Sequence, residues 1–271
     1  MDNTRAGMPQ FGIADADVVY VEQVEGGLTR LITVFHTRLP AEVGAVRSMR
    51  STDVQLLPSY GRPILVASGG AGAQMQRLYK SVLVDATQQS GGPGFWRSSF
   101  GDGTHNLHVN LRTVANAYPG KGKAQPMGFS FSTHDKRLVN ARRTSLIDVT
   151  MLAGRIKFTY SGGKYRPYYF DTPYVDHDGR PVFTQNVLVQ HVRDEPDGTV
   201  DSLGSASYLS HTVGKGKFTL YRDGRVINGT WLRPSVTSPT KYLDLKGKPV
   251  PFKPGKTWVL LAPQTSVINH G

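Results

Sequence analysis

Two apolar segments near the start of the chain have the composition of β-strands. Residues 18–24 and 28–36 are rich in valine, isoleucine, threonine and aromatic residues, which favour extended structure. The glycine pair 26–27 separates them and favours a tight hairpin turn, which would place Gln23 opposite Arg30. Because both faces of the strands are apolar, we expect the hairpin to lie in a sheet that is covered on both sides.

Short helical patterns follow the hairpin. Residues 64–67 are apolar, and the stretch SGGAGA then leads into apolar residues that recur at helical spacing between positions 75 and 82. Ser51 is the predicted N-cap of an earlier short helix, and Asn110 or Thr113 is placed to cap a later one. This alternation of strand, glycine turn and helix indicates an α/β arrangement.

The second half of the chain has a different pattern. From about residue 146, strand-like runs are separated by Gly-Gly, Asp-Gly and Lys-Gly turns, which is typical of antiparallel strands. We predict a mixed-sheet α/β domain with short helices over residues 1–145, followed by a β-rich domain over residues 146–271. The predicted fold class is therefore α+β, with an α/β first part.

The charge of the chain points to anionic partners. Lysine and arginine number 32 against 20 acidic residues, which gives a formal net charge of +12 and a field that attracts polyanions or anionic surfaces. Nucleic acid, anionic lipid and anionic cell-wall polymer all suit that field, and a merely solvated basic surface is the alternative. The cations form no basic block or stripe, so nucleic acid ranks last.

The sequence lacks cysteine and long apolar runs, and both absences exclude certain kinds of site or location. The chain contains no cysteine, which excludes disulfides, thiolate catalysis and thiolate metal sites. It also has no apolar run of about 18 residues and no signal-peptide core in its first ten residues. We expect a protein without a membrane span, from which an export signal is absent.

A glycine turn supplies the first candidate anion site. Ser68, Gly69 and Gly70 precede a predicted helix, where backbone N–H groups and the helix dipole favour an anion. The segment lacks the third glycine of a dinucleotide motif and the lysine of a P-loop. A plain tight turn is the alternative interpretation.

Charged residues near the hairpin supply the second candidate. Arg47 and Arg50 precede the helix predicted at Ser51 and could present two guanidinium groups to a phosphate or carboxylate. Glu25 and Arg30 lie near the hairpin tip, where Glu25 could act as a general acid or base. The alternative is that these residues pair with one another as structural ion pairs.

His105 is the third candidate, as an acid or base near Glu25. It lies in THNLH, where His105 and His108 have a spacing that can bind metal on a helix, but the segment reads as extended and no nearby carboxylate completes a ligand set. We therefore expect no metal and no cofactor. A loop histidine with an ordinary hydrogen bond is the alternative.

Several of these segments carry a resemblance to a known family. VEGGLTR, GAVRSMR, SGGAG and THNLH, with GTWLRPSVTSPTKYLDLKGKPVPFKPGKTWV near the end, resemble the YerB-like bacterial lipoproteins, whose domain of unknown function has two parts. The resemblance spans nearly the whole chain and implies an exported, extracytoplasmic protein tethered by a lipidated cysteine. That cysteine is absent here, so we expect membrane contact only through an anchor outside this chain.

The resemblance also implies site residues, although it implies no reaction. Position by position, the motifs give Glu25, Gly26, Gly27, Thr29 and Arg30, then Arg47, Ser48 and Arg50, then Gly69 and Gly70, and finally His105, Asn106 and Leu107. At His108 the sequence departs from the family, in which an aromatic residue is expected.

These observations predict one cleft in the first domain. Its proposed members are Glu25, Arg30, Arg47, Arg50, Ser68, Gly69, Gly70, His105 and Asn106. We expect it to bind an anionic envelope ligand, either a glycopolymer or a peptidoglycan fragment. One alternative is hydrolysis or transfer on such a polymer, with Glu25 and His105 moving protons. The other is a structural or partner-binding envelope protein in which the charges form a buried ion-pair network.

Overall fold

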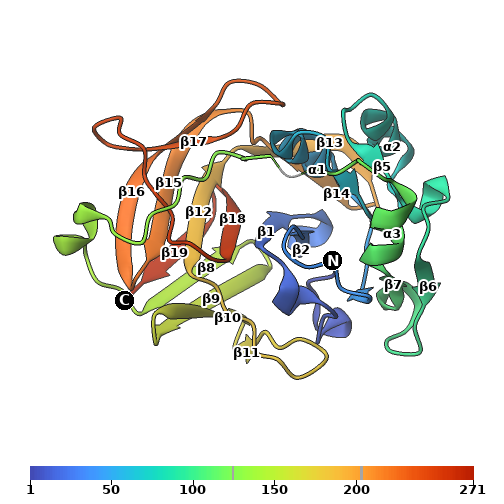
Figure 1. The fold of residues 1–271 in the computed structure, drawn as a ribbon, viewed down its shortest axis with the longest axis horizontal. Helices are drawn as coiled ribbons and strands as arrows, with labels where there is room; N and C mark the ends of the chain where they lie inside the picture. Colours follow the sequence, from blue (N-terminus) through green and yellow to red (C-terminus); the bar gives the residue numbers. More distant parts are fainter. Residues whose placement is uncertain (124, 202–203) are drawn as a thin grey trace.

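A seven-stranded sheet runs through the middle of the molecule (Figure 1). The computed structural model describes residues 1–123, 125–201 and 204–271. The strands of this sheet, in spatial order, are β17 (Lys241–Asp244), β16 (Arg225–Arg233), β15 (Gly214–Arg222), β12 (Asn186–Val192), β18 (Thr257–Pro263), β1 (Val18–Gln23) and β2 (Thr29–Val34). Strand β18 is parallel to both of its neighbours, and the other pairs are antiparallel.

Smaller sheets and short helices surround this sheet. A five-stranded sheet consists of β11 (Thr172–Pro173), β10 (Lys164–Tyr169), β9 (Gly154–Ser161), β8 (Leu146–Met151) and β19 (Val267–His270). The remaining elements are β3 (Val43–Gly44) with β7 (Leu107–Val109) and β6 (Phe95–Arg97), β4 (Ile64–Leu65) with β5 (Val84–Asp85), β13 (Asp194–Val200) with β14 (Ala206–Ser210), and helices α1 (Ser51–Leu56), α2 (Gly72–Tyr79) and α3 (Leu111–Ala117). This β-rich α+β arrangement confirms the predicted fold class.

The large sheet contains strands from both halves of the chain. Val18 of β1 pairs with Thr257 of β18, and the pairing continues to Val21 and Leu260. The β13–β14 hairpin, which belongs to the second half of the chain, lies beside α1 and α2 of the first half (Figure 1). The domain boundary at residue 145 remains a prediction. The seven-stranded sheet contains strands from both sides of that residue.

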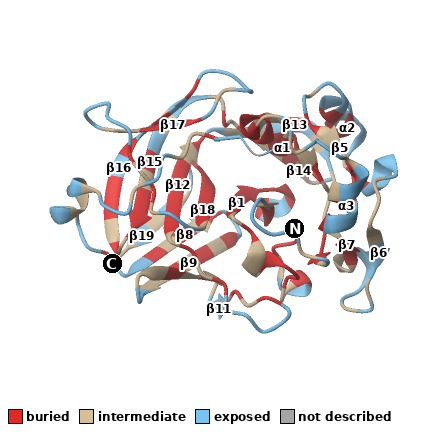
Figure 2. Ribbon diagram, in the orientation of Figure 1, coloured by how far each residue is buried: buried red, intermediate tan, exposed pale blue. Residues whose placement is uncertain are grey.

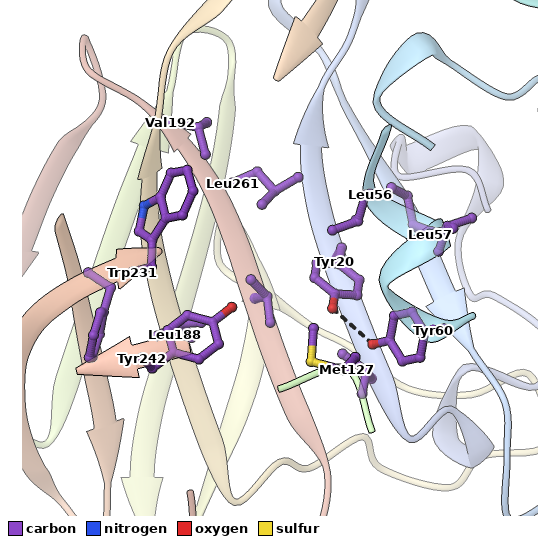
Figure 3. Packing of buried hydrophobic residues seen from close by; sticks show 14 of the residues in the cluster. Tyr20, Leu56, Leu57, Tyr60, Met127, Leu188, Val192, Trp231, Tyr242 and Leu261 are labelled. Atoms are coloured by element: carbon purple, nitrogen blue, oxygen red, sulfur yellow. Dashed lines mark hydrogen bonds between the residues drawn. The ribbon is translucent and has the colours of Figure 1, made fainter. Parts of the chain in front are cut away.

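The strands β12, β18 and β1 in the middle of the seven-stranded sheet are buried on both faces, whereas β16 alternates buried and exposed residues (Figure 2). On one face, Val19 and Trp258 pack against the five-stranded sheet, where the rings of Trp258 and Phe158 meet edge to face. On the other face, Tyr20 lies in a cluster with Leu56 at the end of α1 (Figure 3). The expectation that the hairpin is covered on both sides is therefore confirmed, and each such side chain contributes roughly 1.5–3 kcal/mol by burial.

The register of the β1–β2 hairpin differs by one residue from the prediction. Gln23 lies opposite Thr29, and Glu22 lies opposite Arg30. The connection is a 3-10 turn, Glu25–Gly27, in which both glycines have positive φ angles of 63° and 73°. The turn holds one more residue than a two-residue loop, and a shift of one residue exchanges the faces of a strand.

The helices agree with the prediction except at one cap. Helix α2 follows the glycine turn as predicted, and the Asn110 side chain accepts hydrogen bonds from the first turn of α3. The predicted N-cap Ser51 is wrong because Arg50 occupies that position. The backbone N–H of Arg50 donates to Asp53 Oδ2 at 2.6 Å, and the Ser51 hydroxyl donates instead to Asp197.

The turn residues of the second half have the predicted role. Gly162 and Gly163 join β9 to β10 with φ angles of 57° and 80°, and Asp223 and Gly224 join β15 to β16 with φ angles of 52° and 65°. Two consecutive positive φ angles match the right-handed twist of the paired strands. These dipeptides therefore fix the register of the β-rich half.

A hydrogen bond between two buried tyrosines offers a test of this core. The hydroxyl groups of Tyr20 and Tyr60 lie 2.8 Å apart (Figure 3). We predict that Tyr20→Phe lowers the free energy of unfolding by about 1–3 kcal/mol, because it removes the partner of a buried hydroxyl group. The double variant Tyr20→Phe/Tyr60→Phe should cost less than the sum of the single changes in urea unfolding. Additive losses would show that the pair is not coupled.

Candidate functional site

A cavity of about 370 Å³ lies between strand β2 and helix α3. Protein interiors leave few spaces larger than a water molecule, and ligand pockets begin at about this size. Most of its wall is apolar, formed by Ile32, Val34, Val46, Leu57, Leu65, Val109, Leu111 and Val114, among others. The exposed residues of the lining, which mark its opening, are His36, Leu39, Lys121 and Lys123.

Three ionisable side chains reach the inner part of this cavity. Glu22 and Arg30 come from paired positions of β1 and β2, and Asp53 comes from α1. Burial raises the pKa of Glu22 well above its usual value, and the nearby Asp53 adds to the shift. Burial and the charge of Arg50 lower the pKa of Arg30 to about 10. Burial therefore favours the neutral form of the Glu22 carboxyl group, beside the guanidinium group of Arg30.

These groups have unused hydrogen-bonding capacity. Glu22 is 1% exposed, and neither of its carboxyl oxygens makes a hydrogen bond of normal geometry with a described residue, although Thr52 is close enough to influence its pKa. The Nε atom of Arg30 also makes none within the described parts of the chain. Buried polar groups are nearly always paired, so these two residues of the cavity lining are exceptions to a general rule.

Asp2 joins three of the predicted site residues. Its carboxylate lies 3.9 Å from Arg30 Nη1, 3.6 Å from Arg47 Nη1 and 2.6 Å from His105 Nδ1. Burial would raise the pKa of Asp2, but the charges of Arg30 and Arg47 outweigh it and lower the pKa. Arg47 also donates to the carbonyl oxygen of Thr104 at 2.5 Å. Asp2 therefore fixes Arg47 at the cavity wall and orients His105 beside it.

Glu25 and Arg50 form a separate, buried pair. Arg50 Nη2 donates to Glu25 Oε2 at 2.6 Å, and the two side chains are 9% and 8% exposed. Ser207 of β14 donates to the other carboxylate oxygen. Burial would raise the pKa of Glu25, but these two hydrogen bonds lower it. Glu25 is thus an ionised structural partner under the β13–β14 hairpin.

Asp197 attaches that hairpin to the first half of the chain. Its carboxylate accepts hydrogen bonds from Ser51 at 2.5 Å and Gln74 at 3.2 Å, and Arg77 lies 3.3 Å away. Ser210 N–H donates to Thr52 Oγ1 at 3.0 Å further along the same contact. The hairpin therefore closes over Glu25 through polar contacts with α1 and α2.

The glycine turn lies beside the arginine segment, but its amides have partners. Ser68 N–H donates to the Arg47 carbonyl oxygen at 3.1 Å, and Gly70 N–H donates to Gln89 Oε1 at 3.0 Å. A Cβ atom on Gly69, whose φ is 140°, would lie 2.1 Å from Gln89 Oε1. The turn therefore needs glycine for a close approach, and these two amides serve the fold.

The THNLH segment divides its two histidines between different contacts. His105 faces Asp2, whereas the buried His108 places Nδ1 2.7 Å from Glu42 Oε1. Asn106 accepts a hydrogen bond from Arg97 at 2.8 Å and does not line the cavity. Within the described ranges, no group of three or more histidine or acidic residues is arranged to hold a metal ion.

The predicted cleft is therefore only partly assembled. Arg30 and Arg47 line the cavity, and His105 joins them through Asp2. Glu25 touches Arg50 and Ser207 and does not contact His105, so the expected pair of proton-transfer groups is not in contact. Ser68 bonds to Ser48, which lines the cavity, with 3.2 Å between the hydroxyl oxygens.

Sequence reasoning missed Asp2 and Asp53 as site residues. Asp2 lies in DNTRAG, at the start of the segment that resembles the family, and that was its only signal. Asp53 reads as an ordinary acid of a first helical turn. Glu22 did have a signal, because an acid among apolar strand positions needs a partner or a neutral form.

The buried Glu22 predicts an unusual pH dependence. Because its pKa is raised in the folded state, Glu22 favours folding below its unfolded value of about 4.5 and opposes it progressively as the pH rises through the folded pKa. We predict that Glu22→Gln equals the wild type in stability near pH 4 and exceeds it at pH 8. The gain should be up to about 1.4 kcal/mol per pH unit within the window. Urea unfolding at several pH values measures it, and a variant that is less stable at pH 8 would contradict it.

The Glu25–Arg50 pair predicts a large loss when one member is removed. We expect Arg50→Met to lower the free energy of unfolding by about 3–5 kcal/mol, because it leaves a buried carboxylate without its counter-charge. Arg50→Met combined with Glu25→Leu should recover part of that loss in thermal or urea unfolding. The exposed Arg143 supplies the control, since Arg143→Met should stay within about 0.5 kcal/mol.

Comparisons with known proteins agree with this architecture. The N-terminal and C-terminal domain models of the protein of unknown function DUF3048 match residues 1–124 and 147–259. The protein named "Putative lipoprotein YerB" of Bacillus subtilis (strain 168) is 26% identical over 274 residues, which covers 97% of this chain and 80% of that protein.

A solved structure has the same fold. The crystal structure of the YerB protein from Bacillus subtilis matches with a TM-score of 0.81 at 23% sequence identity, and the match covers 99% of this chain and 91% of that one. Among the described residues, no helix of this protein has the length and apolarity needed to span a membrane. With both parts of the family model matched in order, the chain belongs to the YerB-like family defined by the two DUF3048 domains.

Proposed function

We propose that this protein binds an anionic ligand of the bacterial cell envelope, holding its charged group at the inner end of the β2–α3 cavity. The name of the Bacillus subtilis relative, a putative lipoprotein, supports an extracytoplasmic location at the membrane. The net charge of +12 supports attraction to anionic envelope molecules.

One observation carries this proposal: Glu22 and Arg30, which each have a buried polar atom without a hydrogen-bond partner among the described residues, both line the cavity. Burial favours the neutral carboxyl form of Glu22, which can donate one hydrogen bond, and Arg30 can donate through Nε. The charge of Arg47 lies nearby. A carboxylate or phosphate group is the complementary acceptor.

The apolar lining of the β2–α3 cavity limits what the uncharged part of the ligand can be. A polysaccharide segment would need a hydrogen-bonding partner for each buried hydroxyl group, and the long apolar wall supplies few of them. The cavity therefore favours an anionic ligand with an apolar part, or the anionic end group of a larger envelope molecule. An extended glycopolymer strand is the less suitable occupant of this cavity.

The contacts of Glu25 and His105 favour binding over catalysis. Glu25 is held as a carboxylate by Arg50 and Ser207 beneath the β13–β14 hairpin, and it does not line the cavity. The Asp2 carboxylate orients His105, and neither of these two residues lines the cavity. The buried Glu25–Arg50 pair instead fits the structural network that was the rival hypothesis for these charges.

An alkyl phosphate series tests the proposal. We predict that the wild type binds a long-chain alkyl phosphate in isothermal titration calorimetry, and that Arg30→Met weakens binding by about ten- to a hundredfold through loss of a charged hydrogen bond. Ala115→Trp, which fills the cavity from α3, should abolish binding while the protein stays folded. The exposed Arg143→Met should bind like the wild type.

Two further ligands make the outcome decisive. The alcohol of the same chain length should bind much more weakly, because it cannot match the donors at Glu22 and Arg30. Inorganic phosphate should also bind weakly, because it lacks the apolar part. Equal binding of the alcohol, or binding that Ala115→Trp leaves intact, would overturn the proposal.

A further inference from the structure

A second concave region lies where β12 and β18 end and β15 begins. This groove of about 700 Å³ is open to solvent and shares no lining residue with the β2–α3 cavity. Its wall includes the end of β12 at His191, Gln264 just after β18, and the first residues of β15 from Gly214 to Lys217. We call it the basic groove.

The side chains of the basic groove carry mainly positive charge. Its ionisable lining residues are His191, Arg193, His211, Lys215 and Lys217, and no acidic residue lines it within the described chain. Glu195 nearby pairs with Arg193 at 3.4 Å and with His211 at 2.6 Å. Lys215 and Lys217 are exposed and make no ion pair with any described residue. Two cations are thus available to a ligand.

The two lysines have a fixed spacing. They stand two residues apart on β15, so they project from the same face about 7 Å apart along the strand. Between them, a Cβ atom on Gly216 would lie 2.6 Å from Trp231 Nε1, and the indole N–H donates to the His191 carbonyl oxygen at 2.9 Å. Trp231 therefore packs where only glycine fits and holds the strand ends in place.

From this geometry we infer that the basic groove binds a phosphodiester polyanion without stackable bases, such as a polyol phosphate chain. Two free lysines at a regular spacing match charges that recur along a polymer. Single-stranded nucleic acids need exposed aromatic rings for their bases, whereas Trp231, the one aromatic residue in the lining, is 2% exposed. This site uses none of the residues of the proposed function.

Charge reversal of the two lysines tests the inference. Fluorescence anisotropy with a labelled poly(glycerol phosphate) oligomer and the full chain would be measured at several salt concentrations. We expect Lys215→Glu/Lys217→Glu to weaken binding at least about tenfold and to lower the slope of log affinity against log salt by about two, one for each lost phosphate contact. Both residues are exposed, so equal melting temperatures check that the variant is folded.

A matched variant separates a site from net charge. Lys241 and Lys246 are exposed lysines outside the groove, and Lys241→Glu/Lys246→Glu changes the net charge by the same amount. This control should keep wild-type affinity for the polymer. In the wild type, the polymer should also shift the indole N–H resonance of Trp231.

Three results would overturn the inference. One is an equal loss in the control pair, which would mean non-specific attraction by the whole surface. Another is tighter binding of a single-stranded oligonucleotide of the same charge, which would mean a nucleic-acid site. The last is an unmoved Trp231 resonance at saturating polymer, which would place the polymer elsewhere.

Discussion

The burial of strand β1 between β18 and β2 is the constraint on which the fold and the candidate site both depend. Its backbone groups are paired on both edges, and its side chains meet apolar partners on both faces. An acid in such a strand is held in the interior, so Glu22 is 1% exposed and lies opposite Arg30. The same pairing that builds the core therefore places a carboxyl group in the cavity wall.

The protein handles its buried charges in two ways. Arginines and hydrogen bonds outweigh the cost of burial at Asp2 and Glu25 and lower the pKa of both carboxyl groups, whereas burial raises the pKa of Glu22. An ion pair in a protein interior gives little net stability, but losing one partner is costly. The Glu25–Arg50 pair is closed off by the β13–β14 hairpin, while Arg30 lines the cavity. The pair therefore has a structural role, and Arg30 is the charge that our proposal assigns to the ligand.

The two proposed ligand regions would attract their ligands through different physical interactions. In the β2–α3 cavity, apolar walls and a few buried donors would select a ligand by shape and by one acidic group. In the basic groove, exposed lysines would act through long-range attraction that salt weakens. An envelope protein with both could hold a small amphiphilic molecule while resting on an anionic polymer, and either site can be lost without the other.

The sequence by itself determined the local elements and the charge. Strand composition, the Asp-Gly and Gly-Gly turns, helix α2 and the Asn110 cap could all be predicted, because each depends on residues within a few positions of one another. The sequence also predicted one cleft containing Arg30, Arg47 and His105, and in the structure Asp2 joins these three residues.

Only the tertiary structure decided the rest. The β1–β2 register differs by one residue from the prediction because the connection is a 3-10 turn and not a two-residue loop. The side chains of β2 therefore lie on the opposite faces from those predicted. The pairing of Val18 with Thr257 and the contact of Glu25 with Ser207 join residues more than 180 positions apart. Such contacts leave no periodic signal in the sequence, because they depend on how sheets and hairpins pack in space, and they settle which charges are buried and which can meet a ligand.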